Sequence, residues 1–70
     1  MNYEVLLNIN STYYRINDKI EIEFISNNKR IVTVAIIKDI NTNYMNIYNL
    51  KNKLYYEVIY NNIIKIKGQI

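Results

Sequence analysis

Hydrophobic and polar residues alternate along short stretches of this chain, with the period of two that is typical of half-buried β-strands. The clearest stretch runs from Lys19 to Ser26, where Ile20, Ile22 and Phe24 alternate with glutamates. We expect the apolar side of this stretch to face the core. Residues of the β-branched type are frequent and no 3.6-residue stripe is visible, so helix is disfavoured throughout the chain.

Asparagine separates these stretches, because proline is absent and the single glycine, Gly68, lies almost at the end. Asparagine tolerates the left-handed backbone region and hydrogen-bonds its own turn, so it can take the place of glycine. Segments that contain asparagine, at 27–28, 41–43, 51–53 and 61–62, therefore predict turns. Between them we predict five strands, at Lys19–Ser26, Arg30–Asp39, Tyr44–Leu50, Leu54–Ile59 and Ile63–Lys67.

The second predicted strand, Arg30–Asp39, is apolar on both faces. This fits a long strand bent through the middle of a barrel, and its outer side could also be buried against a neighbour. The connections are only a few residues long, which favours sequential antiparallel pairing, since a parallel crossover needs about a dozen residues or more. The sequence thus predicts an all-β fold, a five-stranded and strongly bent antiparallel meander that closes or nearly closes into a small barrel.

The length of 70 residues fits a single domain near the lower limit at which a hydrophobic core holds a fold. We assign residues 18–70 to the barrel and residues 1–17 to an N-terminal arm or an extra strand. A helical turn over Tyr3–Leu7 is the alternative for the first residues. Without cysteine, stability must come from packing or self-association, so a homo-oligomer is expected.

The chemistry of the chain argues against catalysis. Histidine and cysteine are absent, so the commonest general base and the thiolate nucleophile are missing. No glycine-rich phosphate loop occurs. The only close pair of carboxylates on one face, Glu21 and Glu23, fits a solvated strand surface better than a metal site. We expect no enzyme activity, no cofactor and no metal.

Two features of the sequence indicate where in the cell the protein is expected. The first residues lack the basic and apolar regions of a secretory signal. The longest nearly unbroken apolar run, residues 31–37, is far shorter than the ~20 residues that a membrane-spanning helix needs. We expect a cytoplasmic protein without a membrane partner.

One segment carries a family resemblance. Ala35–Asn41 followed by Tyr44–Leu50 resembles the first conserved motif of Sm and Sm-like proteins, and its most specific part is Tyr44-Met45-Asn46. The resemblance implies a small SH3-like barrel that assembles into a ring around RNA. It also implies that Tyr44 stacks on a base and that Asn46 reads a base edge, as aromatic and amide side chains can.

The resemblance is incomplete in three places. Ala35 stands where the family has glycine, the turn before Met45 is one residue longer, and the second motif is not intact. Tyr60-Asn61 occupies the position of the family's Arg-Gly or Lys-His pair. In this position we expect Tyr60 to stack on a base in place of the arginine.

The formal net charge of +3 is compatible with a polyanionic partner. However, Asn, Ile, Lys and Tyr have codons rich in A and T, so an AT-rich genome raises them without selection for function. The placement of the basic residues is more informative: Lys29 and Arg30 share a predicted turn, and Lys65 and Lys67 share one strand face. They are either solubilising charges or a basic patch.

Two hypotheses of different classes follow. The first is a nucleic-acid-binding, ring-forming barrel that holds RNA or single-stranded DNA. Its candidate contact residues are Tyr44, Asn46, Tyr60, Lys65, Lys67, Lys29 and Arg30. The second is a protein-interaction module, for instance a small regulator or inhibitor of a host protein, encoded by a phage or mobile element of an AT-rich bacterium. It would act through its tyrosines and the apolar outer face of residues 30–37. The sequence favours the first by a narrow margin.

Overall fold

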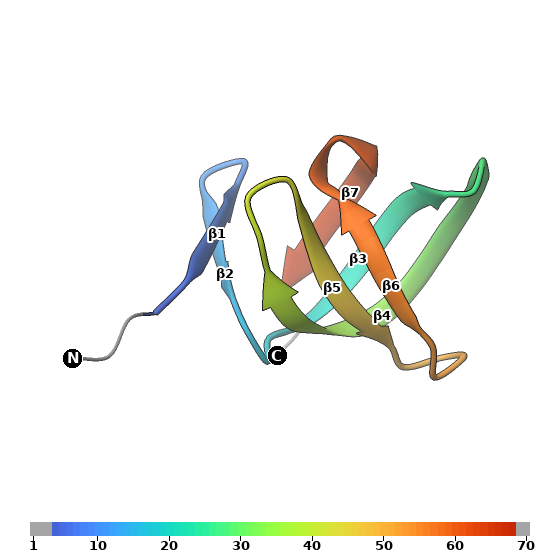
Figure 1. The fold of residues 1–70 in the computed structure, drawn as a ribbon, viewed down its shortest axis with the longest axis horizontal. Coiled ribbons are helices and arrows are strands. Elements are labelled where there is room, and N and C mark those ends of the chain that lie inside the picture. The colour runs from blue at the N-terminus through green and yellow to red at the C-terminus, as the bar shows by residue number, and fades with distance from the viewer. Residues whose placement is uncertain (1–3, 69–70) are drawn as a thin grey trace.

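A computed structural model describes residues 4–68 of the chain. Most of these residues lie in strands (Figure 1). The elements are β1 (Leu6–Ile9), β2 (Thr12–Arg15), β3 (Lys19–Ser26), β4 (Lys29–Ile40), β5 (Tyr44–Asn49), β6 (Tyr55–Ile59), the 3₁₀ turn η1 (Tyr60–Asn62) and β7 (Ile63–Gly68). Within this range no helix is long and apolar enough to cross a membrane.

Five strands form one antiparallel sheet in the order β6-β5-β4-β3-β7. Strands β3 to β6 follow one another as a meander, and β7 then returns to pair with the far side of β3. The predicted all-β class, the antiparallel pairing and the positions of the five strands are confirmed, whereas the predicted sequential order fails at the last strand, because β7 pairs with β3 and not with β6. Register shifts between Ile37 and Asp39 on β4 and between Glu23 and Phe24 on β3 interrupt the ladders, as β-bulges do where strands bend.

The sheet is not closed, because β6 and β7 are its two edges and no ladder joins them within the described residues. A tight hairpin would have paired β6 with β7. Instead η1 follows β6 without a gap and carries the chain across to β3. The sequence predicted a barrel that is closed or nearly closed. Backbone pairing does not close it.

The N-terminal region forms a separate hairpin of β1 and β2, so the extended alternative was the right one and the helical turn was wrong. The first three residues of the predicted arm lie outside the described residues. Asn10 and Ser11, at the tip of the hairpin, have φ values of 52° and 68°. Such values suit a two-residue hairpin turn. Leu7 and Tyr14 are buried, and the Tyr14 hydroxyl donates to the Ile66 carbonyl at 3.4 Å, which attaches the hairpin to β7.

The core lies on the concave side of the bent sheet. It consists of Leu7, Tyr14, Ile20, Ile22, Phe24, Ala35, Ile37, Met45, Ile47 and Val58. The apolar face predicted for β3 is thus confirmed. The ring of Phe24 meets that of Tyr56 edge-on, with centroids 5.7 Å apart. Such an edge-to-face pair is worth about 0.5–1.5 kcal/mol beyond its burial.

The β3–β4 turn confirms the prediction that asparagine replaces glycine. Asn27 and Asn28 have φ values of 51° and 61°. This left-handed conformation at both central residues matches the twist of the flanking strands, and asparagine adopts it with less strain than most residues.

Candidate functional site

The side of the sheet that faces away from the core carries both exposed and partly buried side chains, and we call it the outer face. Strand alternation and the ladder register place one set of residues from each strand on it. Its central members are Lys65 and Lys67 of β7, Glu21 and Glu23 of β3, Val32, Val34 and Ile36 of β4, Asn46 and Tyr48 of β5, and Tyr55 and Glu57 of β6.

The β7–β3 side of the outer face is charged, but positive and negative groups are paired. The ammonium of Lys67 lies 3.0 Å from the Glu21 carboxylate, and the guanidinium of Arg30 forms an ion pair with Glu23. Lys65 stands directly opposite Glu23 in the register. Lys65 and Lys67 therefore do share a face, as predicted, and that face also carries two carboxylates.

The middle of the outer face is apolar and aromatic. We call the row formed by Val32, Val34, Ile36, Tyr48 and Tyr55 the apolar strip. Val32 is 60% exposed and Tyr55 is 69% exposed, whereas the other three are half-buried. The rings of Tyr48 and Tyr55 form a tilted cross-strand pair with centroids 4.9 Å apart. The expectation that β4 is apolar on both faces is confirmed.

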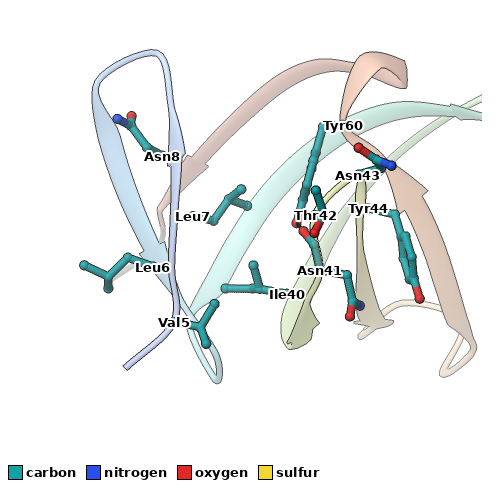
Figure 2. A pocket seen from close by; sticks show the side chains of 10 residues that line it. All are labelled: Val5, Leu6, Leu7, Asn8, Ile40, Asn41, Thr42, Asn43, Tyr44 and Tyr60. Carbon is teal, nitrogen blue, oxygen red and sulfur yellow. Dashed lines mark hydrogen bonds between the residues drawn. The ribbon is translucent and has the colours of Figure 1, made fainter. Parts of the chain in front are cut away.

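A second feature is an open cleft of about 710 Å³ between the N-terminal hairpin and the β4–β5 turn, which we call the hairpin cleft (Figure 2). Its lining residues are Val5, Leu6, Leu7, Asn8, Ile40, Asn41, Thr42, Asn43, Tyr44 and Tyr60. Figure 2 shows Leu7 and Ile40 in the space between hairpin and sheet, with Tyr60 across from Leu7. None of the lining side chains is charged.

Tyr60 joins two parts of the fold at the hairpin cleft. Its hydroxyl donates to the Asn41 carbonyl at 2.7 Å, and its backbone N–H donates to the Asn43 carbonyl at 3.1 Å. Burial raises the pKa of the Tyr60 hydroxyl, and the nearby Asp39 carboxylate raises it further. The hydroxyl thus stays protonated and ties the β4–β5 turn to η1.

The structure brings together only part of the residues predicted to bind nucleic acid. Tyr44 and Tyr60 both line the hairpin cleft. Asn46 lies farther along β5, opposite Glu57 of β6. Met45, the middle of the Tyr-Met-Asn triplet, is fully buried in the core.

The predicted basic contacts are elsewhere. Lys29 and Arg30 lie at the tip of the β3–β4 hairpin, which extends away from the N-terminal hairpin (Figure 1). Lys65 and Lys67 lie on β7, beside Glu23 and Glu21. No lysine or arginine lines the hairpin cleft, so the tyrosines there have no adjacent cation to hold a phosphate.

Sequence reasoning missed the hairpin cleft and the Tyr48–Tyr55 pair. The segment Asn10-Ser11 between two short stretches with apolar residues was a signal for the hairpin. The tyrosine pair depends on the β5–β6 register, which alternation alone does not fix. Across residues 4–68, no three side chains of the metal-ligating acidic, histidine or cysteine types gather in one place.

Comparison with models of protein families, with curated proteins and with solved structures finds no match. The antiparallel sheet is compatible with a small β-barrel-like fold. No relative supports membership of the Sm family.

Proposed function

We propose that this chain is a non-catalytic protein-binding module whose contact surface is the apolar strip. The observation that carries the proposal is the exposure of Val32 on β4 and of Tyr55 on the edge strand β6, at the two ends of a row in which Tyr55 packs against the Tyr48 ring. Contiguous apolar surface of this kind is unfavourable in water and often marks an interaction site. Tyrosine is enriched in the centres of protein interfaces because it buries a ring and keeps a polar tip.

The charged side of the outer face supports a protein partner. Interfaces commonly have an apolar centre and a polar rim. Here Lys67, Glu21 and Arg30 provide polar groups on one side of the apolar strip, and their ion pairs, with the buried Glu23 as the partner of Arg30, leave little unbalanced charge. A nucleic acid would instead favour unpaired cations next to the stacking rings, because phosphate neutralisation dominates its affinity.

The proposal is tested by comparing two doubly substituted surfaces in co-purification from the native cell after nuclease treatment. Val32→Ser with Tyr55→Ser removes the exposed part of the apolar strip. The matched control, Tyr13→Ser with Ile16→Ser, removes two exposed apolar side chains in and directly after β2 of the N-terminal hairpin. We expect the first pair to lose a bound protein at least about tenfold relative to the control. Equal retention by both pairs would show that the apolar strip is not the contact surface.

Nucleic-acid binding by an Sm-like homo-oligomer is the second candidate. The observations in its favour are that Tyr44 and Tyr60 share the hairpin cleft and that the net charge is positive. It predicts binding to oligo-U or single-stranded DNA that falls steeply with salt and weakens on Tyr44→Ala or Asn46→Ala in a folded chain. Fluorescence polarisation against both probes, with duplex DNA for comparison, decides the matter. Affinity no higher than for a scrambled polyanion at physiological salt eliminates this candidate.

A further inference from the structure

We propose that the hairpin cleft binds an uncharged, extended peptide, which adds as a strand to the free edge of β1. This inference concerns a different surface from the apolar strip and does not depend on it. It rests on three observations: the direction of the backbone groups of β1, the position of that edge in the cleft, and the absence of charge in the lining.

The hydrogen bonds of Arg15 fix the direction of the β1 backbone groups. The Arg15 N–H donates to the Asp18 carboxylate at 2.8 Å, and the Arg15 carbonyl accepts from the Asp18 N–H at 3.1 Å. Both groups thus point away from β1, and Leu6, which is opposite Arg15, belongs to a non-hydrogen-bonded pair. The N–H and C=O of Leu6 therefore point away from β2, and with a period of two so do those of Asn8.

The edge of β1 that carries these outward groups borders the hairpin cleft. Four consecutive residues, 5–8, line it, as expected when the edge of a strand opens onto a cavity. Within residues 4–68, no backbone hydrogen bond joins Leu6 or Asn8 to the opposite wall. Natural edges are commonly blocked by lysine or proline, and β1, with the sequence LLNI, carries neither.

The lining selects the chemistry of the occupant. Leu7 and Ile40 offer an apolar floor between hairpin and sheet, and Asn41, Thr42 and Asn43 add polar groups on the opposite wall (Figure 2). A polyanion would find no cation there. An extended peptide satisfies the Leu6 and Asn8 backbone groups and can place one apolar side chain over the floor, as in other cases of strand addition.

The test selects binders for the full chain from a displayed library of random eight-residue peptides and measures the affinity of the synthetic consensus. We expect a consensus of alternating apolar and uncharged polar residues. Asn8→Pro removes an outward N–H without breaking a β1–β2 bond, and we expect it to weaken binding about tenfold. Its matched control, Tyr13→Pro, removes the outward N–H of the facing residue on the other edge of the hairpin. The control should change affinity less than about twofold.

A second readout leaves the protein unaltered and holds even if Asn8→Pro does not fold. Two versions of the consensus peptide are methylated on the backbone nitrogens of either the odd or the even residues, and each version has one of its two hydrogen-bonding edges blocked. We expect one of the two versions to bind about tenfold more weakly than the unmethylated peptide. Any of three results overturns the proposal: no enriched consensus, a consensus rich in charged residues, or equal loss with both proline variants. A wild-type dimer that Asn8→Pro converts to a monomer also overturns it, because the occupant would be a second copy.

Discussion

Asn49 provides a sharp test of how the sheet is held together, because it is a buried polar residue with several partners. Its side chain is only 3% exposed, at the end of β5. The side-chain oxygen accepts from the Thr33 hydroxyl at 2.6 Å, from the Lys51 N–H at 2.9 Å and from the Asn52 N–H at 3.4 Å. One amide thus organises the β5–β6 turn and joins it to β4. Asn49→Ala removes all three bonds.

The magnitude follows from these distances. The two shorter hydrogen bonds contribute about 0.5–1.5 kcal/mol each, and the third, at the limit of the range, contributes less. The buried Thr33 hydroxyl also loses its better acceptor, keeping only a long contact of 3.4 Å to the Val34 carbonyl. We therefore expect Asn49→Ala to lower the free energy of unfolding by about 3 kcal/mol. For a domain of this size, that corresponds to a fall in melting temperature on the order of 15 °C.

Urea denaturation followed by far-UV circular dichroism measures this change. Asn43→Ala is the matched control, because Asn43 is exposed and its side chain makes no hydrogen bond within residues 4–68. Thr33→Val, which removes one donor, should cost about 1 kcal/mol alone and less than that when Asn49 is already alanine. A loss below about 0.5 kcal/mol for Asn49→Ala, or one equal to that of the control, would refute the reasoning.

Three further predictions concern the core, a turn and pH. Phe24→Ala empties a fully buried site and should cost about 3–5 kcal/mol, enough to abolish cooperative urea unfolding in so small a domain. Asn28→Val forces a β-branched residue into positive φ and should lower the urea midpoint, whereas Asn28→Gly should leave it almost unchanged. The pKa of Tyr60 is raised above its ordinary value of 10.0, so the folded chain binds this proton more tightly than the unfolded chain. The resulting stabilisation is complete below pH 10 and is lost as the pH rises through the raised pKa. Above pH 10 the urea midpoint of Tyr60→Phe should therefore fall less steeply with pH than that of the unaltered chain. Identical slopes for the two chains would contradict this assignment.

Local patterns predicted much of the fold because each depended on neighbouring residues only. Strict alternation identified the core face of β3, with Ile20 and Phe24 completely buried. Asparagine pairs identified the β3–β4 turn, because Asn27 and Asn28 adopt the left-handed conformation that few residues tolerate.

The remaining features depended on contacts between distant residues. The ion pairs of Lys67 with Glu21 and of Arg30 with Glu23 follow from the register of β7 and β4 against β3, which residue spacing within one strand does not determine. The same register places the Glu21 and Glu23 carboxylates beside Lys67 and Arg30, for which the sequence had left solubilising charges and a basic patch as alternatives. The hydrogen bond from the Tyr60 hydroxyl to the Asn41 carbonyl likewise joins residues nineteen positions apart in the chain.

The central claim, that the apolar strip binds a protein, is tested most directly by site-specific photo-crosslinking in the native cell. A photoreactive phenylalanine analogue replaces Tyr55 on the apolar strip in one variant and Tyr13 on the N-terminal hairpin in the other; both side chains are more than half exposed. We predict a discrete protein adduct that survives nuclease from position 55 and is absent from position 13. A nuclease-sensitive adduct at position 55, or the same adduct from both positions, would contradict the claim.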